Sequence, residues 1–94
     1  MQKKVLVIKL GTAVITDEEG RIDQLVIKKI AAQIAMLGRE YNIVLVSSGA
    51  VGSGKSFFKK YKGTLTEKKA AAAVGNPMLI NLYHQYFSAY DIPV

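Results

Sequence analysis

Apolar positions along the chain form two kinds of pattern, short continuous runs and runs with helical spacing. Residues 5–10 and 43–46 are almost entirely aliphatic, which is typical of strands buried on both faces of a parallel sheet. Between them, apolar side chains recur every three or four residues and predict a core-facing helix stripe, formed by Val26, Ile30, Ile34 and Leu37. Strand, helix and strand in this order predict a βαβ unit with parallel strands and a right-handed crossover.

Polar residues and glycines predict where these elements begin and end. Residues 13–16 are expected to extend the first strand after a bend at Gly11, and residues 17–20 to form a turn. Asp23 is suited to cap the following helix, which ends near Gly38. Residues 41–42 are the predicted turn into the second strand.

The second half of the chain predicts a long helix. Thr64 and Glu67 have the spacing of a capping box. Residues 76–77, Asn-Pro, are expected either to kink this helix or to start a new one. His84 is expected to be packed rather than catalytic. Beyond the proline, large apolar side chains form a broad helix face, made of Met78, Leu79, Leu82, Tyr83, Tyr86 and Phe87.

The last residues predict an incomplete sheet. Residues 91–94 are expected to form a loop that leads into a third strand. A sheet of two strands has poorly covered edges. We therefore expect the chain to be the first part of a longer α/β domain.

Composition narrows the classes of function. The chain has 94 residues, with 13 Lys and Arg against 7 Asp and Glu, no Cys and one His. The absence of Cys excludes a disulfide framework and a thiolate metal site, and a single His argues against a zinc site, so we predict no metal site. No stretch approaches the roughly 20 apolar residues of a membrane span. We expect a cytoplasmic protein.

Residues 49–56 read GAVGSGKS and satisfy the pattern of a phosphate-binding loop. In a nucleotide hydrolase, Lys55 would reach the β and γ phosphates and Ser56 would ligate magnesium. However, that loop normally follows the first strand of its fold, whereas a complete strand and helix precede residue 49 here. We interpret the match as a glycine-rich turn with an exposed lysine, and keep a P-loop hydrolase as an alternative.

Polar residues and glycines also follow both predicted strands. Since the carboxyl ends of parallel strands meet at one edge, where ligands bind, two groups should lie together: Lys9, Gly11 and Thr12, and Ser47, Ser48, Gly49 and Ala50. Lys9 would place a cation there, and the N–H groups at a helix start would bind a carboxylate or phosphate. This arrangement suits phosphoryl transfer. The alternatives are a strand lysine that extends to solvent and ordinary serine capping.

Three blocks of sequence resemble the amino-acid kinase family: residues 7–12, VIKLGT; residues 46–51, VSSGAV; and residues 72–76, AAVGN. The resemblance covers essentially the whole chain. Within the family it is strongest to the branch that phosphorylates the side-chain carboxylate of L-glutamate, the first step of proline biosynthesis. It implies a three-layer αβα sandwich with a mostly parallel sheet. Residues 1–94 would be its N-terminal, substrate-side part, without the nucleotide-binding half.

The resemblance also implies roles for the residues at the sheet edge. Lys9 matches the catalytic lysine that contacts ATP, and Gly11 and Thr12 match the turn on the phosphate side. Ser48 matches a glutamate-binding serine, in a substrate loop shared by Ser47, Gly49 and Ala50. The implied cofactors are ATP and Mg²⁺, and the implied assembly is a dimer or tetramer. Family members that act on acetylglutamate, aspartate, carbamate or a small phosphate share the block around Lys9 and remain alternatives.

Basic residues interleave with aromatic ones after residue 54. The lysines are Lys55, Lys59, Lys60, Lys62, Lys68 and Lys69, around Phe57, Phe58 and Tyr61. Such interleaving can mark nucleic-acid binding. No recognition motif accompanies it, so we favour a solvated basic face. The tyrosines after Pro77 could instead face a second subunit.

Overall fold

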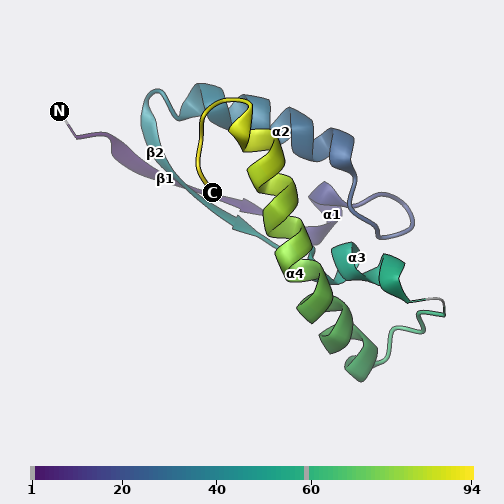
Figure 1. Cartoon of the computed structure of the whole chain (residues 1–94). Coiled ribbons are helices and arrows are strands. Elements are labelled where there is room, and N and C mark those ends of the chain that lie inside the picture. The colour runs from purple at the N-terminus through teal and green to yellow at the C-terminus, as the bar shows by residue number, and fades with distance from the viewer. Residues whose placement is uncertain (1, 59) are drawn as a thin grey trace.

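Two parallel strands and the helices that pack on one face of them form the fold. The computed structural model describes residues 2–58 and 60–94, and only the backbone of Ser56. The elements, in chain order, are β1 (Lys4–Leu10), α1 (Thr12–Ile15), α2 (Gln24–Leu37), β2 (Tyr41–Ser47), α3 (Ala50–Gly54), a 3₁₀ turn (Lys55–Phe57) and α4 (Leu65–Ser88). Figure 1 shows α2 and the second half of α4 beside the two strands, and α3 against the first half of α4.

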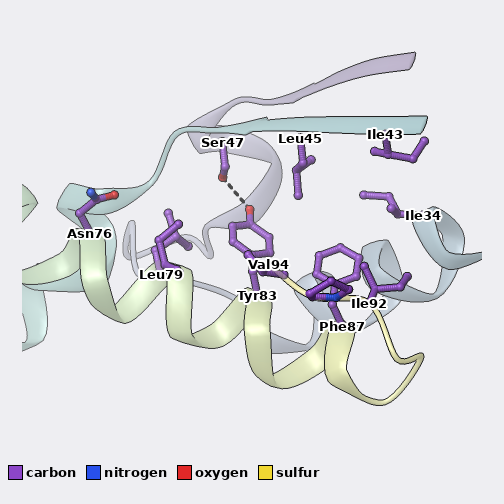
Figure 2. A pocket seen from close by; sticks show the side chains of 12 residues that line it. Ile34, Ile43, Leu45, Ser47, Asn76, Leu79, Tyr83, Phe87, Ile92 and Val94 are labelled. Atoms are coloured by element: carbon purple, nitrogen blue, oxygen red, sulfur yellow. Dashed lines mark hydrogen bonds between the residues drawn. The ribbon is translucent and has the colours of Figure 1, made fainter. Parts of the chain in front are cut away.

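The two strands pair in parallel, as the sequence predicts. Lys4 lies opposite Tyr41 at one end of the ladder, and Leu10 lies opposite Ser47 at the other. The second strand therefore begins at Tyr41, where we expected a turn. Paired residues of a parallel ladder share a face, so the inner face, toward the helices, consists of Leu6, Ile8, Leu10, Ile43, Leu45 and Ser47. Figure 2 shows the β2 side chains of this face pointing toward α4.

The outer face of the sheet is exposed, and the prediction of strands buried on both faces is wrong for this chain. The exposed fractions are 64% for Val5, 61% for Val7, 48% for Val44 and 47% for Val46. A continuous aliphatic run shows that both faces are apolar, but it does not show which face the chain itself covers. The predicted α/β class with a parallel sheet is confirmed, and the described residues form two of its layers.

Residues 12–15 form a short helix instead of the predicted strand extension. The N–H of Val14 donates to the carbonyl of Gly11 at 3.1 Å, and Thr16 then forms an antiparallel bridge with Ile22. Ile15 is fully buried. Its burial outweighs the strand preference of these β-branched residues, because tertiary packing routinely overrides local propensity. The turn predicted at residues 17–20 is confirmed by a bond from the Gly20 N–H to the Asp17 carbonyl.

The helix α2 has the predicted cap but a shifted core stripe. The carboxylate of Asp23 accepts from the N–H groups of Leu25 and Val26. The buried residues are Ile27, Ala31 and Ile34, whereas the expected stripe had Val26, Ile30 and Leu37 beside Ile34. Val26 and Ile30 are half-buried and Leu37 is 38% exposed. Both stripes have helical spacing, and α1 and α4, which pack against α2, select the one that faces them.

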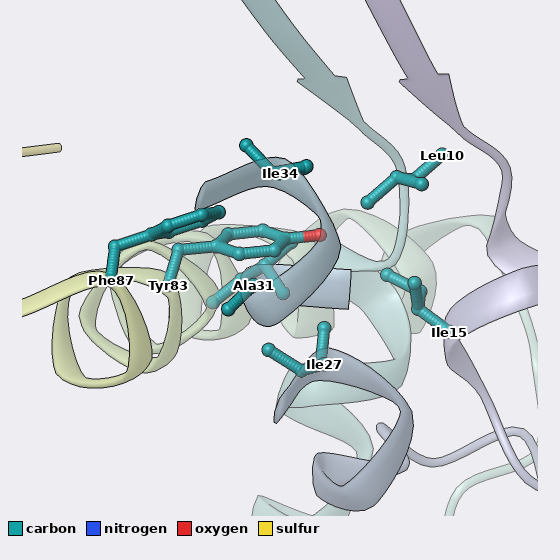
Figure 3. Packing of buried hydrophobic residues seen from close by; sticks show 8 residues of the cluster. Leu10, Ile15, Ile27, Ala31, Ile34, Tyr83 and Phe87 are labelled. Carbon is teal, nitrogen blue, oxygen red and sulfur yellow. The ribbon is translucent and has the colours of Figure 1, made fainter. Parts of the chain in front are cut away.

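The core lies between the inner sheet face, α2 and α4. Figure 3 shows side chains of β1, α1, α2 and α4 meeting there. The buried members are Leu10, Ile15, Ile27, Ala31, Ile34, Leu79, Tyr83 and Phe87. Each fully buried aliphatic side chain contributes about 1.5–3 kcal/mol. This core fixes the carboxyl ends of both strands.

The helix α4 starts at the predicted capping box and continues through Pro77. The Glu67 N–H donates to Thr64 Oγ1 at 3.2 Å, and the Thr64 N–H donates to Glu67 Oε1 at 3.1 Å. Hydrogen bonds to its charged form lower the pKa of the Glu67 carboxyl. The largest contribution comes from the N–H of Lys62, and smaller ones come from the N–H and the hydroxyl of Thr64. No new helix starts at residue 76, because α4 continues to Ser88.

The end of α4 and the residues after it differ from the prediction at one position. His84 is exposed, so the expectation of a packed histidine is wrong; the buried stripe of α4 passes through Tyr83 and Phe87 instead. Residues 91–94 form the predicted loop. The third strand predicted beyond them stays a prediction.

Candidate functional site

The two segments that follow the strands start side by side. Leu10 and Ser47 are paired as the last strand residues, and the N–H of Ser48 donates to the carbonyl of Leu10 at 2.9 Å. The sequence prediction that both segments reach one sheet edge is therefore confirmed. This edge is the candidate site.

The turn after β1 is open. Lys9 is exposed and lies on the outer face, paired with Val46. Gly11 is extended, with φ −74°, and a Cβ added to it would meet nothing within 4 Å. Thr12 is exposed as well. The chain's own packing therefore does not require glycine at position 11, and the turn has room for a ligand.

The exposure of Lys9 removes one argument for its function. A lysine within an apolar strand would be costly if it were buried, but this side chain reaches solvent without crossing the core. Among the described residues it also has no carboxylate partner. Its catalytic role stays a prediction that rests on the sequence block and on its place at the edge.

The turn after β2 is closed by contacts. Gly49 caps α3 with φ 108°, a left-handed conformation that favours glycine. A Cβ at this position would lie 2.6 Å from Cδ1 of Ile15 and 3.2 Å from Cδ1 of Ile22. Ser48, just before it, is exposed. Residues 47–50 are the segment that the sequence predicts to bind substrate, and we call them the substrate loop. The backbone of this loop is fixed, while Ser48 faces outward.

Ser47 differs from its neighbour because its hydroxyl is already bonded within the chain. Ser47 Oγ lies 2.6 Å from the hydroxyl of Tyr83, as the dashed line in Figure 2 shows. Ser47 Oγ donates its own proton to the carbonyl of Ser48 at 2.8 Å, so Tyr83 is the donor between the two hydroxyls. Burial raises the pKa of Tyr83, which keeps this phenol protonated. The hydroxyl of Ser47 is therefore engaged within the chain, whereas Ser48 is exposed to solvent.

Tyr83 is the residue at this edge that the sequence did not identify. It is 3% exposed, so the alternative in which the helix tyrosines face a second subunit does not hold for Tyr83. It lies 36 positions from Ser47. Only the helical spacing Leu79, Tyr83, Phe87 hints that its ring faces the sheet.

A close contact between α3 and α4 supports the substrate loop at its Ala50 end. A Cβ on Gly75 would collide with the carbonyl oxygen of Ala50 and lie 2.5 Å from the N of Gly54. A Cβ on Gly54 would collide with the carbonyl of Ala71. The two backbones thus touch directly, which only glycine permits. Within the sequence block AAVGN, it is Gly75 that packs against the loop.

The conformation of residues 49–56 is not that of a phosphate-binding loop, so the P-loop alternative is not supported. Residues 50–54 form a helix, and Gly52, Ser53 and Gly54 are buried. Lys55 Nζ lies 5.3 Å from the centroid of the Tyr61 ring. The proposed magnesium ligand, the Ser56 side chain, lies outside the described part of the chain. The glycines of this motif serve helix packing.

The basic and aromatic segment forms an exposed face. Phe58 and Tyr61 pack edge to face at 5.9 Å. The lysines of this segment and of the start of α4 are exposed, namely Lys60, Lys62, Lys68 and Lys69. Lys59, also part of the expected cluster, lies outside the described residues. The arrangement agrees with a solvated basic face.

Neither a metal cluster nor a membrane-crossing helix is found in the part of the chain that the structure describes. Residues 2–58 and 60–94 hold no group of three His, Cys, Asp or Glu side chains placed to bind a metal ion. No helix there is both long and apolar enough to cross a bilayer.

Comparison with known proteins places the chain in a family. The model of the amino acid kinase family matches residues 4–94, and the chain belongs to this family. Its similar relatives are glutamate 5-kinases. That of Citrifermentans bemidjiense is 42% identical over 94 aligned positions, which cover 97% of this chain and 25% of the relative. That of Herpetosiphon aurantiacus is 44% identical over 92, covering 95% and 25%. That of Thermoanaerobacter sp. (strain X514) is 39% identical over 88, covering 90% and 24%. The chain thus spans about a quarter of the length of these relatives.

Proposed function

We propose that this chain is the substrate-side part of a glutamate 5-kinase. The complete protein would transfer the γ-phosphoryl group of ATP to the side-chain carboxylate of L-glutamate, the first step of proline biosynthesis. The observation that carries the proposal is the bond from the Ser48 N–H to the Leu10 carbonyl, which brings the two family blocks to one sheet edge. Three glutamate 5-kinases similar to this chain support the choice of substrate.

The residues at the edge divide into a phosphate side and a glutamate side. Lys9 would neutralise charge on the transferred phosphoryl group, the main task of a protein in phosphoryl transfer. The open turn at Gly11 and Thr12 would admit the ATP phosphates. A carboxylate oxygen of glutamate would attack the γ-phosphorus while the bond to the bridging oxygen of ADP breaks. No general base is needed, because the carboxylate is ionised at neutral pH.

The substrate loop would bind glutamate through Ser48 and the backbone of Gly49 and Ala50. Ser48 is the exposed hydroxyl of the loop and can bond a carboxylate. Ser47, also assigned to the substrate by the sequence, would act through the loop because its hydroxyl is bonded to Tyr83.

The remaining components belong to the complete protein. Mg²⁺ is usually held by carboxylates together with substrate phosphates. The described residues hold no group of three His, Cys, Asp or Glu side chains placed to bind a metal ion, so they do not fit a magnesium site of their own. We place the nucleotide-binding half in the part of the protein beyond this chain, and we expect a cytoplasmic dimer or tetramer.

A chimera tests the proposal. This chain replaces the matching segment of the Citrifermentans bemidjiense enzyme, and ADP release is measured with glutamate, acetylglutamate, aspartate and carbamate as acceptors. We expect activity with glutamate. A preference for another acceptor would assign the chain to a different member of the family.

The role of Lys9 is tested in the same chimera. We expect Lys9→Ala to lower kcat about 100-fold or more, because a charge that stabilises the transition state is lost, with little change in the glutamate KM. Lys4→Ala, at the opposite end of β1, is the matched control and should leave kcat unchanged. A large rise in the glutamate KM at constant kcat would contradict the assignment.

A further inference from the structure

We infer that Tyr83 is a positioning residue that holds the substrate loop in its binding conformation through Ser47. The inference rests on the proposed function, since it assigns the loop to glutamate. It concerns a residue on α4 that does not itself face the open edge.

A continuous series of hydrogen bonds links Tyr83 to the loop. The Tyr83 hydroxyl donates to Ser47 Oγ, and Ser47 Oγ donates to the Ser48 carbonyl. The Ser48 N–H in turn donates to Leu10. Both backbone groups of Ser48 are therefore engaged, and its side chain is the part left to turn outward. The series thus orients the one hydroxyl of the loop that is available to a ligand.

Tyr83 is itself held rigidly, as a positioning residue must be. Its ring is stacked on Phe87 with centroids 6.2 Å apart, and its side chain is 3% exposed. Figure 3 shows the Tyr83 ring at α2, near Ile34 and Ala31, with its hydroxyl directed toward Leu10 of β1. A buried donor of this kind has few alternative partners.

The same helix also supports the other end of the loop. Gly75 lies against the Ala50 carbonyl, eight residues before Tyr83 and about 12 Å away along the helix axis. α4 therefore holds the loop at both ends, at Ser47 by a hydrogen bond and at Ala50 by backbone contact. Removal of the Tyr83 hydroxyl frees the first end alone.

The test compares two tyrosines of α4 in the chimera. Tyr83→Phe removes the bond to Ser47, whereas Tyr86→Phe removes a bond from the Tyr86 hydroxyl to Gln24 Oε1, away from the loop. We expect Tyr83→Phe to raise the glutamate KM about tenfold, the usual effect of one lost buried hydrogen bond, with the ATP KM unchanged. Tyr86→Phe should change neither. If Tyr83 only stabilised the fold, its loss would reduce the fraction of correctly folded enzyme. The apparent kcat would then fall while both KM values stay unchanged, and this result would overturn the inference.

Ser47 variants show whether Tyr83 acts through this serine. We expect Ser47→Ala to raise the glutamate KM as much as Tyr83→Phe does, and the double variant to add little to either one, because coupled residues are not additive. Ser47→Thr keeps a hydroxyl and should restore most of the affinity. Full additivity would refute a shared pathway.

Hydrogen exchange separates this inference from the proposed function. Amide exchange in residues 47–50 should be faster in Tyr83→Phe than in the parent chimera, and unchanged in Tyr86→Phe. This measurement does not depend on turnover. If the parent chimera does not phosphorylate glutamate, the proposed function is wrong. The positioning role of Tyr83 is judged separately, and equal exchange rates in all three proteins would overturn it.

Discussion

The two turns at the sheet edge both contain glycine but differ in what surrounds it. After β1, Gly11 has an ordinary extended backbone and empty space where a side chain would be. After β2, Gly49 has a left-handed backbone, and Ile15 and Ile22 close around it. The first turn is free toward solvent, whereas the second is fixed by the fold. A glycine in open space points to a ligand more strongly than a glycine that packing requires.

This difference also explains why the sharpest motif of the sequence misleads. The pattern in residues 49–56 places glycines at the spacing of a phosphate loop, but Gly52 and Gly54 face backbone atoms of Gly20 and Ala71. The spacing of the glycines is the same whether they bind a phosphate or allow two helices to pack closely. Only the residues that contact these glycines in the folded chain show which of the two reasons applies.

The largest expected effect is at the contact that supports the closed turn. Gly75→Ala would force a methyl group into the Ala50 carbonyl, and we expect a loss of about 3 kcal/mol or more in the free energy of unfolding, at the upper end for overpacking. Urea denaturation of the chimera measures it. The control is Ala73→Gly, at an exposed position of the same helix, which should cost only about 1 kcal/mol through helix propensity. Equal losses would show that the two helices are not in contact.

A smaller effect is expected at Gly49 itself. Gly49→Ala combines left-handed strain of about 1–2 kcal/mol with the crowding by Ile15. Gly63→Ala is matched, because Gly63 also has a positive φ, of 78°, but a Cβ there meets only Tyr61 at 4.0 Å. We expect Gly49→Ala to be the more destabilising by roughly 1 kcal/mol, as for a modest core overpacking. Identical midpoints in thermal unfolding would mean that Ile15 moves aside without cost.

A substitution in the open turn after β1 should change the activity of the enzyme more than its stability. Gly11→Ala adds a methyl group where the chain leaves space, so the free energy of unfolding should change by less than about 0.5 kcal/mol. The ATP KM should rise if phosphates approach this backbone closely. Unchanged kinetics with ATP would remove Gly11 from the phosphate side of the site.

The smallest effect on activity is expected at Lys55, the lysine of the misleading motif. Lys55 is half-buried and not exposed as the sequence predicts. Lys55→Ala loses a contact with the Tyr61 ring, worth about 1 kcal/mol, and phosphoryl transfer should stay near normal. A P-loop hydrolase would lose its activity. Comparison with Lys9→Ala in one assay therefore distinguishes the two sites directly.

Features of local chemistry were predictable from the sequence. The Asp23 cap, the Thr64–Glu67 capping box and the parallel strand pair follow from residues close together or from clear periodicity. The strand extension at residues 13–16 was wrong, because local propensity does not include the burial of Ile15. The choice between two overlapping stripes on α2 depended on neighbours that the pattern does not specify.

The candidate site was predictable in its place but not in its support. The sheet edge followed from the parallel topology and from the polar residues after each strand. The bond between Ser47 and Tyr83 joins residues 36 positions apart, and neither residue indicates the other in the sequence. Contacts of this kind come from tertiary packing, so only the structure shows which serine of the pair is free.

The exposed valines of the sheet have a consequence for handling the protein. Val5, Val7, Val44 and Val46 form an apolar strip on the outer face, next to strand edges that have spare hydrogen-bonding groups. Sulfate and similar excluded salts strengthen the burial of such surfaces. Solutions of this chain should therefore tolerate precipitating salts poorly, and dilute buffers of low salt concentration are the natural choice for its purification.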